Sequence, residues 1–416
     1  MNADQILLLI LIIVSTGFIF SQTLEWINIR SMKAEIPEGV AGFYDHEKYL
    51  LSQNYHRTRT KFDFWSSLFS LILTLIILIS GTFGWLDAHL RNYFSGNLLL
   101  AFSFFGIILM ASEILSLPFS WYSTFVIEEQ FGFNKTTPKT FFLDKIKGLL
   151  LGALIGAPLY WLFIKLIEWM GSGFWIWFGL AAALFMLLMN MFYTSWLLPL
   201  FNRLTPLEDG ELKSAIVAYA EKVNFPITQI MVMDGSKRSS KANAFFSGIG
   251  KRKKVVLFDT LIEKHTTEEL VAVLAHEVGH YKKRHLIAGL ALAIGQIFFT
   301  LWMLSYMIFN PELSHALGGN VLATQLNLIA FGILFSPISA ATGLFSLMLS
   351  RKNEFEADAY AGTTYNSKAL ATALKKLSVD TLSNLFPNRL YVFFHYSHPP
   401  LLQRLKHLNT QAHNPQ

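Results

Sequence analysis

The chain has 416 residues, of which 53% are hydrophobic and only 15% are charged, and its formal net charge is +6. Soluble globular proteins carry about 25% charged residues, so this chain has too few charges to cover a water-facing surface. The composition excludes an ordinary soluble enzyme and a disordered protein, and it leaves a polytopic membrane protein. The chain has no cysteine, which also excludes disulfides, thiolate metal sites and lipidation of the chain itself on cysteine.

Seven apolar stretches are long enough to cross a bilayer, because a transmembrane helix needs about 20 predominantly apolar residues. They lie at about 5–22, 64–86, 97–119, 148–169, 174–198, 286–309 and 324–350. The first stretch differs from a signal peptide, since no Lys or Arg precedes it and no small-residue cleavage site follows it. We therefore expect an all-α polytopic membrane protein with seven transmembrane helices.

Positively charged residues lie almost entirely on one side of this topology. All of the 34 Lys and Arg residues except Arg91 and Lys165 fall in the loops after the first, third and fifth helices or behind the seventh. The positive-inside rule then predicts an outside N-terminus, a cytoplasmic C-terminus and a cytoplasmic loop at 201–285. This bias accounts for the net charge, so we expect no nucleic-acid partner, even for the basic run at 251–254.

The long loop at 201–285 contains the elements of a small folded unit. Apolar residues recur at helical spacing over about 209–223. Three short runs rich in Val, Ile and Phe follow at 227–233, 244–249 and 255–258. They predict a meander of three strands. Thr266, three residues before Glu269, marks a capping box at the start of a second helix. We expect a small α+β insert between the fifth and sixth membrane helices.

The second helix carries an HExxH motif, formed by His276, Glu277 and His280. Residues four apart share one helix face at about 6 Å, so both imidazoles can reach one metal ion at about 2.0–2.1 Å. Glu277 is rotated by about 100° from His276, which lets it contact a metal-activated water and take its proton. Gly279 inside the motif permits another backbone to approach closely. Two surface histidines on an amphipathic helix are the alternative interpretation.

A catalytic zinc site has three protein ligands, so a third ligand must come from elsewhere. His285 lies five residues beyond His280 and is rotated away from the shared face, so we expect it at the membrane interface. A better segment follows the seventh membrane helix, where Glu354 and Asp358 share a helix face. One carboxylate could bind zinc while the other accepts the second N–H of a histidine ligand. A run of charges at a helix end is the alternative.

Several motifs in a fixed order carry a resemblance to a known family. HEVGH at 276–280 is followed by NEFEADAYA at 353–361 and by HYSHPPLLQRL at 395–405. IEEQFGFNK at 127–135, Asn243-Ala244-Phe245 and VVLFDT at 255–260 add to it. Together they resemble the Ste24-type integral-membrane zinc metalloproteases, the CAAX prenyl endopeptidases of the M48 peptidase family, along the whole chain.

The resemblance implies a zinc site and its chemistry. His276, His280 and Glu354 would bind one Zn²⁺ per chain. Glu277 would be the general base, and Asp358 would partner a histidine ligand.

The resemblance also implies how a substrate is held. His398 would stabilise the oxyanion across the scissile carbonyl from the zinc. Arg404 would orient His398 or pair with Asp358. Asn243, with the backbone of Ala244 and Phe245, would hold the peptide as an added strand. In this family the seven helices enclose a large water-filled chamber, with the active site facing into it near the cytoplasmic side.

The expected organisation has four parts. They are the membrane helices of 1–200, the metallopeptidase insert of 201–285, the membrane helices of 286–350 and the segment 351–416 that completes the zinc site. The family activity is removal of the C-terminal tripeptide of prenylated CAAX proteins. The expected partners are therefore the lipid bilayer and a peptide or protein substrate, prenylated where the family substrate applies. The short tail without a KDEL-type or dilysine ending favours a bacterial cytoplasmic membrane over the endoplasmic reticulum.

Two other functions stay open at this point. The first is a membrane quality-control metalloprotease that has no prenylated substrate. The second is a transporter with an incidental HExxH motif, since Lys165 and Glu168 lie one turn apart in the fourth span and charges there usually mark function. These two residues could equally form a pair at a helix end.

Overall fold

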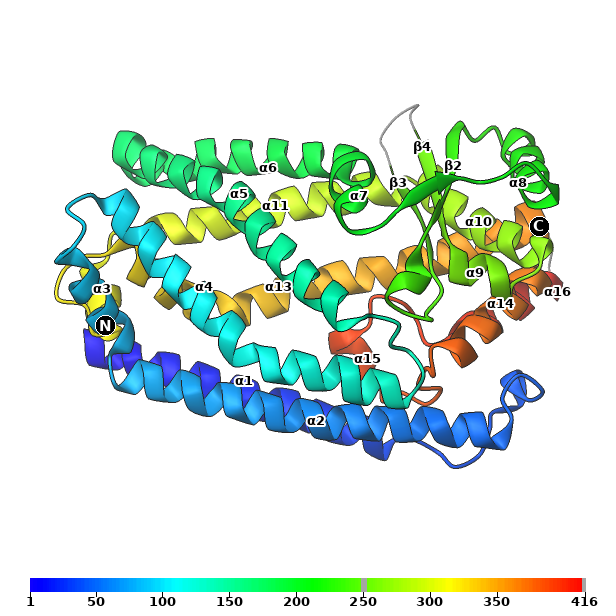
Figure 1. Ribbon diagram of the computed structural model, residues 1–416, viewed down its shortest axis with the longest axis horizontal. Coiled ribbons are helices and arrows are strands. Elements are labelled where there is room, and N and C mark those ends of the chain that lie inside the picture. The colour runs from blue at the N-terminus through cyan, green and yellow to red at the C-terminus, as the bar shows by residue number, and fades with distance from the viewer. Residues whose placement is uncertain (248–252, 414–416) are drawn as a thin grey trace.

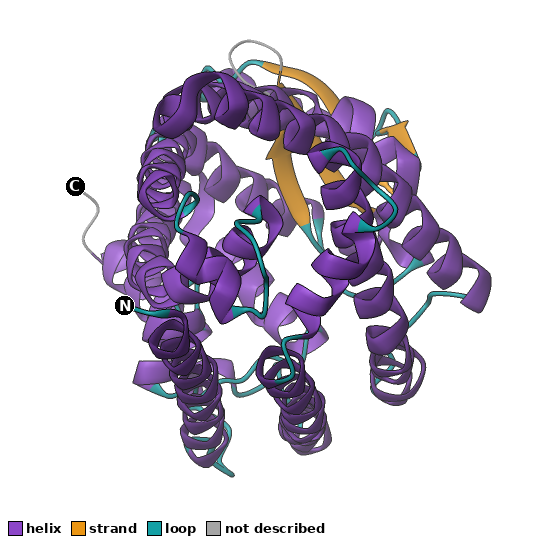
Figure 2. Ribbon diagram, turned by 90° about the vertical axis from the view of Figure 1, so that its left-hand side faces the viewer, coloured by secondary structure: helices purple, strands orange, loops and turns teal. Residues whose placement is uncertain are grey.

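Long helices make up most of the molecule. The computed structural model describes residues 1–247 and 253–413. The long helices are α1 (Ala3–Arg30), α2 (His46–Ile79), α4 (Asn97–Tyr122), α5 (Pro138–Met170), α6 (Phe174–Phe192), α11 (His285–Met307) and α13 (Thr324–Ala361). They run roughly along the longest axis of the molecule (Figure 1), and in the view along that axis they stand around a ring (Figure 2).

Six helical stretches of the described chain are long and apolar enough to cross a membrane, which confirms a polytopic membrane protein. Five of them correspond to one predicted segment each. The sixth, Pro138–Phe201, covers the fourth and fifth predicted segments. Here the chain turns at Gly171, which has a φ of 53°. Phe163 of α5 then packs edge-on against Phe174 of α6, with 5.3 Å between ring centroids. This stretch is therefore two helices that fold back on one another.

Helix ends differ from the ends of the apolar segments. α2 begins at His46 and ends at Ile79, whereas the predicted segment is 64–86. The helix stops early because Gly81 adopts the left-handed conformation, with a φ of 65°, and begins the short α3 (Thr82–Arg91). α2 begins 18 residues before the predicted segment, because hydropathy detects the lipid-facing part of a helix and not its polar extension into water.

Shorter helical pieces join these elements. They are α7 (Leu198–Phe201), α9 (Asp259–Lys264), α12 (Pro311–Ala316), α14 (Ser367–Asp380), α15 (Arg389–His395) and α16 (Leu401–His413), with π-helical turns at Ser123–Glu128, Tyr193–Leu197 and Gly362–Asn366 and 3-10 turns at Glu38–Val40, Gly171–Gly173 and Gly235–Lys237. The helices α14 and α16 lie beside the insert at one end of the molecule, as Figure 1 shows.

The insert between α7 and α11 holds a four-stranded sheet, so the predicted three-stranded meander is wrong. Its strands are β1 (Leu204–Pro206), β2 (Ile227–Met233), β3 (Ala244–Ser247) and β4 (Lys253–Phe258), in the order β1-β2-β4-β3. β4 pairs in parallel with β2 and antiparallel with β3. Its buried Val255, Val256 and Leu257 suit this central place, where both faces are covered. The last two residues of the predicted strand 244–249 lie outside the described residues.

Two helices of the insert confirm the predicted α+β unit, α8 (Glu211–Lys222) and α10 (Thr267–Lys282). The predicted capping box is present, because the Thr266 hydroxyl accepts from the backbone N–H of Glu269 while the Glu269 carboxylate accepts from that of Thr266. The apolar face of α10 packs in one core with the sheet, α8 and α14. Its buried members are Leu270, Val271, Leu274, Ala275 and Val278. This packing fixes the rotation of α10.

α13 is long enough to cross a membrane and to continue beyond it. Its 38 residues span about 57 Å at 1.5 Å per residue, whereas the hydrocarbon core is about 30 Å thick. The final turns pass directly against α10. A Cβ atom built on Gly279 would lie only 3.0 Å from the Cα of Ala357 and 3.1 Å from its carbonyl oxygen. The predicted close approach at Gly279 is therefore confirmed.

Replacing Gly279 with valine should destabilise the protein, because the new side chain meets the backbone of α13. We expect a loss of about 1–3 kcal/mol, the usual cost of overpacking, measured by thermal unfolding in detergent. Gly289→Val on α11 is the matched control, since no atom of the described residues lies within 4 Å of a Cβ at that position. Equal effects of the two substitutions would contradict a tight crossing.

Candidate metal centre and active site

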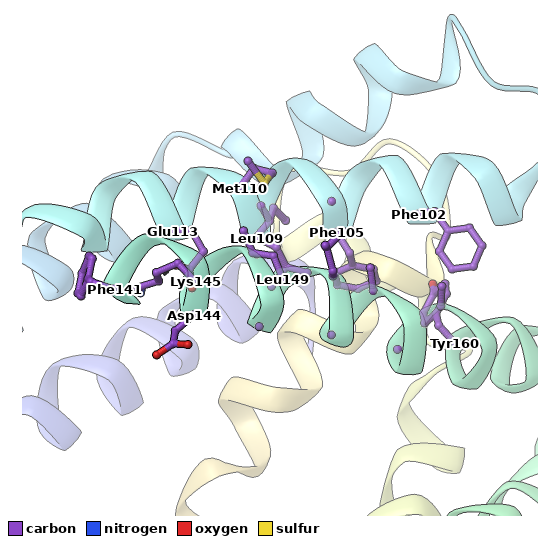
Figure 3. Close-up of a pocket in the computed structure, with 18 of the residues that line it drawn as sticks. Phe102, Phe105, Leu109, Met110, Glu113, Phe141, Asp144, Lys145, Leu149 and Tyr160 are labelled. Atoms are coloured by element: carbon purple, nitrogen blue, oxygen red, sulfur yellow. Dashed lines mark hydrogen bonds and ion pairs between the residues drawn. The ribbon is translucent and has the colours of Figure 1, made fainter. Parts of the chain in front are cut away.

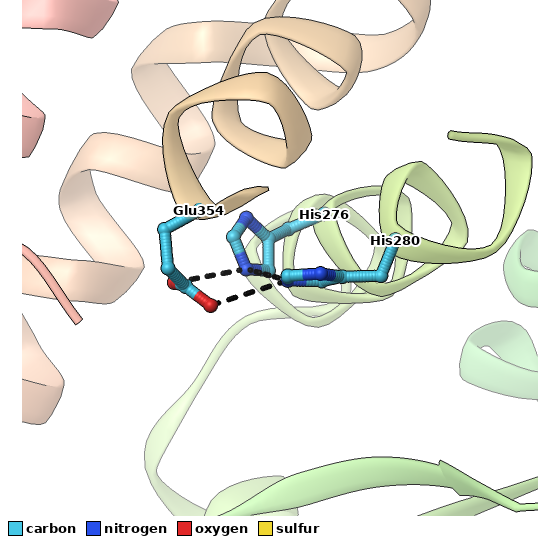
Figure 4. A group of neighbouring side chains, drawn as sticks. All are labelled: His276, His280 and Glu354. Carbon is cyan, nitrogen blue, oxygen red and sulfur yellow. Dashed lines mark hydrogen bonds and ion pairs between the residues drawn. The ribbon is translucent and has the colours of Figure 1, made fainter. Parts of the chain in front are cut away.

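Two helices bring three metal-ligand side chains together. α10 presents His276 and His280, and α13 presents Glu354 (Figure 4). The Nε2 atoms of the two histidines are 3.2 Å apart. The Glu354 carboxylate lies 3.5 Å from Nε2 of His276 and 3.3 Å from Nε2 of His280. All three ligand atoms lie within 4.8 Å of one another, so one ion can contact all of them.

These residues fit a divalent cation. Oε2 of Glu354 is buried and has no hydrogen-bond partner among the described residues, although Nη1 of Arg404 lies 3.3 Å away. A metal ion would supply the direct contact that a buried carboxylate oxygen needs. Burial lowers the pKa of His276, but hydrogen bonds with Asp358 and Glu354 outweigh this effect and raise the pKa to about 9. The surroundings thus favour positive charge at this point. Two imidazoles and one carboxylate are also the ligand set of catalytic zinc sites.

Asp358 and Arg404 orient the first histidine. Nδ1 of His276 donates to Asp358 at 2.8 Å, which leaves Nε2 directed at Glu354. Arg404 donates to both oxygens of Asp358, at 2.8 Å from Nε and 2.6 Å from Nη2. Of the two expectations for Arg404, the structure has the pairing with this aspartate. Arg404 also approaches Glu354, with 3.3 Å between Nη1 and Oε2.

Glu277 follows His276 on α10 and is only partly exposed. Burial raises the pKa of its carboxyl group. A raised pKa suits a group that accepts a proton and later returns it near neutral pH.

His398 reaches the same site from the segment between α15 and α16. Its Nε2 lies 3.3 Å from Oε1 of Glu354, and 63% of its side chain is exposed. Its Nδ1 is 2.9 Å from the hydroxyl of Ser397. The guanidinium of Arg351, one turn before Glu354 on α13, donates to the carbonyl of Tyr396 at 2.6 Å and so ties this segment to the ligand helix.

Asn243, Ala244 and Phe245 lie at the edge of the sheet. Within the described ranges, β3 pairs on one side with β4 and its other edge carries no ladder. Asn243 is exposed, and its side-chain oxygen accepts from the backbone N–H of Ala244 at 2.8 Å. The carbonyl of Asn243 accepts from Phe258 on β4. An extended peptide could therefore pair with the outer edge of β3.

His285 begins α11, the sixth predicted membrane helix, as expected, but its side chain turns towards the metal ligands and not away from them. Its Nδ1 is 3.0 Å from Nδ1 of His280, and its side chain is 8% exposed. The expectation extended the helical rotation of α10 through residue 285. In fact α10 ends at Lys282, and Arg284 adopts the left-handed conformation with a φ of 60°, so His285 turns back towards the motif. Helix periodicity cannot detect such a turn.

A separate cavity of about 1120 Å³ lies between α4 and α5 (Figure 3). Its walls are mainly apolar. They include Phe102, Phe105 and Leu109 of α4 and the glycine row Gly148, Gly152 and Gly156 of α5. Glu113 and Lys145 form an ion pair of 3.0 Å at one end. None of the three metal-ligand residues lines this cavity.

The two charges of the predicted fourth span contact one another. Lys165 donates to Glu168 at 2.6 Å, and both side chains are partly exposed near the C-terminal end of α5. This is the expected pair at a helix end, and it belongs to a part of the chain remote in sequence from the metal ligands.

Known protein families cover both halves of the chain. Residues 25–203 match the family described as CAAX prenyl protease N-terminal, five membrane helices, and residues 206–412 match peptidase family M48. CAAX prenyl protease 1 of Saccharomyces cerevisiae is 33% identical over 91% of this chain and 89% of its own length. The human CAAX prenyl protease 1 homolog is 32% identical over 92% of this chain and 90% of its own length.

A solved structure agrees with these relatives. The crystal structure of S. mikatae Ste24p superimposes with a TM-score of 0.92 at 31% identity, covering 97% of this chain and 99% of that one. The relatives named here are eukaryotic, so the bacterial membrane stays a prediction. The chain belongs to the M48 peptidase family, as a membrane metallopeptidase of the CAAX prenyl protease 1 type.

Proposed function

We propose that this metallopeptidase binds one zinc ion and removes the C-terminal tripeptide of prenylated CAAX proteins. The observation that carries the proposal is the convergence of His276, His280 and Glu354, whose ligand atoms lie within 4.8 Å of one another. Zinc held by these three residues would supply the Lewis acidity that lowers the pKa of a water to about 7 and polarises the scissile carbonyl.

Two side chains of this protein would carry the proton and the charge of the reaction. Glu277 takes the proton from the attacking water and returns it to the amine of the leaving peptide. His398 donates a hydrogen bond to the carbonyl oxygen as negative charge develops on it. Nε2 of His398 lies 3.3 Å from the Glu354 carboxylate. This position beside a metal ligand supports the role, because a substrate carbonyl polarised by the zinc would lie close to the imidazole.

The open edge of β3 would bind the substrate backbone. Ala244 and Phe245 begin this strand, Asn243 directly precedes it, and β4 occupies its other side. Pairing of an extended peptide along this edge supplies hydrogen bonds that do not depend on sequence. The α10 helix packs beneath the same sheet, so the edge and the ligands share one rigid unit.

The cavity between α4 and α5 would take the prenyl chain. A chain of isoprene units is apolar, and the Phe and Leu side chains and the glycines that line the cavity match it in chemistry. The glycine row leaves space along the wall, since no atom in the described part of the chain lies within 4 Å of a Cβ built on Gly148, Gly152 or Gly156.

The membrane arrangement is part of the proposal. We infer seven spans, with α5 and α6 as the fourth and fifth, an outside N-terminus and a cytoplasmic insert, because the basic loops share one side. A chamber enclosed by these spans, as the resemblance to the Ste24-type proteases implies, belongs to the same proposal. The four parts bounded at 200, 285 and 350 follow from the same topology.

The decisive experiment compares the purified wild type with Glu277→Gln and Glu354→Ala in detergent, using a farnesylated CAAX peptide and metal analysis. We expect about one zinc per chain in the wild type and in Glu277→Gln, and loss of zinc from Glu354→Ala, because two histidines are an incomplete site. Cleavage should fall at least about 100-fold in Glu277→Gln.

Each other outcome has a definite meaning. Zinc with cleavage of unmodified membrane peptides but not of the farnesylated peptide would replace the prenyl substrate by a quality-control role. A wild type that binds no zinc would overturn the metal assignment.

The substitution His398→Ala tests the oxyanion role. We expect zinc content and KM to stay near wild type and kcat to fall by about 10²–10³-fold, the scale of a lost oxyanion donor. The measurement is steady-state cleavage of the farnesylated peptide. If KM rises instead while kcat is retained, His398 binds the ground state and the transition state equally and is not a specific oxyanion donor.

The substitution Gly152→Leu tests the cavity. A leucine side chain would fill part of the wall space, so we expect KM for the farnesylated peptide to rise about tenfold or more while KM for the same peptide without the prenyl group stays unchanged. Gly295→Leu on α11 is the control, because its Cβ position is also open and it lies outside the cavity lining. Equal effects of Gly152→Leu on both peptides would show that the prenyl group binds outside this cavity.

A further inference from the structure

A second chain of polar contacts leads away from the metal site through His280. Nδ1 of His280 lies 3.0 Å from Nδ1 of His285, and Nε2 of His285 lies 3.1 Å from Oε2 of Glu356. The first two residues flank the end of α10, whereas Glu356 belongs to α13. The three groups therefore connect both helices that supply metal ligands.

The contacts determine where each proton lies when His280 binds a metal. Nε2 of His280 faces Glu354, so metal binding there requires its proton on Nδ1. That N–H can donate only to a lone pair, which Nδ1 of His285 supplies when its own proton is on Nε2. The Nε2–H of His285 then donates to Glu356. Every donor in this series of hydrogen bonds meets an acceptor, and each imidazole ring has a single tautomer.

The two histidine ligands are thus supported in different ways. His276 donates directly to Asp358 at 2.8 Å. Glu356 lies two residues beyond Glu354 on α13, a rotation of about 200°, so its carboxylate points away from the shared face of Glu354 and Asp358. The imidazole of His285 lies between Glu356 and His280 and contacts both.

We propose that His285 is a positioning residue that fixes the tautomer and ring orientation of His280 for metal binding, with Glu356 as its charged support. The proposal rests on the proposed zinc site. Groups that hold the second nitrogen of a histidine ligand contribute about 10–100-fold to metal affinity. The left-handed turn at Arg284 brings His285 into this place, and the 8% exposure of its side chain excludes most water from the contact.

The test is zinc affinity, measured by competition with a chelator on the purified full chain. His285→Leu removes the acceptor at similar bulk, and we expect its affinity for zinc to fall about 10–100-fold. His285→Asn keeps an oxygen acceptor near the position of Nδ1, so we expect it to recover most of that loss. Lys352→Ala is the control, because it removes the exposed partner of Glu356 at 3.7 Å and leaves His285 in place.

The unfolding temperature of the zinc-free protein separates positioning from a structural role. We expect it to be the same in His285→Leu and His285→Asn. Zinc affinity equal to wild type in His285→Leu would overturn the proposal, as would equal losses in both variants accompanied by a lower unfolding temperature. A wild type that binds no zinc would instead overturn the proposed zinc site, so the two failures are distinguishable.

Discussion

The close crossing of α10 and α13 is the constraint on which the active site depends. The two helices approach so closely at Gly279 and Ala357 that a side chain at the glycine would meet backbone atoms. This contact lies within the HExxH motif on one helix and three residues from Glu354 on the other. The separation of the helices therefore sets the distance between the histidines and the carboxylate. The packed core beneath α10 and the length of α13 hold that separation.

The charges at this crossing are unbalanced without a cation. Glu354, Asp358 and Glu277 carry carboxylates, while Arg404 supplies a guanidinium that pairs with Asp358. Buried charges are costly unless they are paired or coordinate a metal. With neutral histidine ligands these groups sum to two negative charges, which a divalent ion between His276, His280 and Glu354 would neutralise. The ion would also contact Oε2 of Glu354, which has no hydrogen-bond partner among the described residues. The metal is thus part of the electrostatic stability of the crossing as well as of its chemistry.

Much of this arrangement could be predicted from the sequence. Hydropathy located the membrane helices, the capping box located the start of α10, and the spacing of His276 and His280 placed them on one face. Periodicity left Glu354 and Asp358 as two candidates, because it shows that they share a face but not which one binds; the family resemblance named Glu354 as the ligand and Asp358 as the partner of a histidine. The contact of Asp358 with Nδ1 of His276 distinguishes them.

Other features depend on long-range packing that a single sequence does not display. The sheet order is one example, since β4 pairs with β2 across an intervening strand in the chain. β1 was missed because it has three residues and ends in Pro206, which reads as a turn. The predicted orientation of His285 was wrong because one left-handed residue, Arg284, breaks the helical rotation on which the expectation was based.

The most direct test of the central claim is anomalous diffraction at the zinc edge from crystals of the zinc-loaded protein. A single strong peak bounded by Nε2 of His276, Nε2 of His280 and the carboxylate of Glu354 is the predicted result. The bond lengths should be about 2.0–2.2 Å. A peak that excludes Glu354, or an ion bound outside the crossing of α10 and α13, would contradict the claim that this crossing builds the metal site.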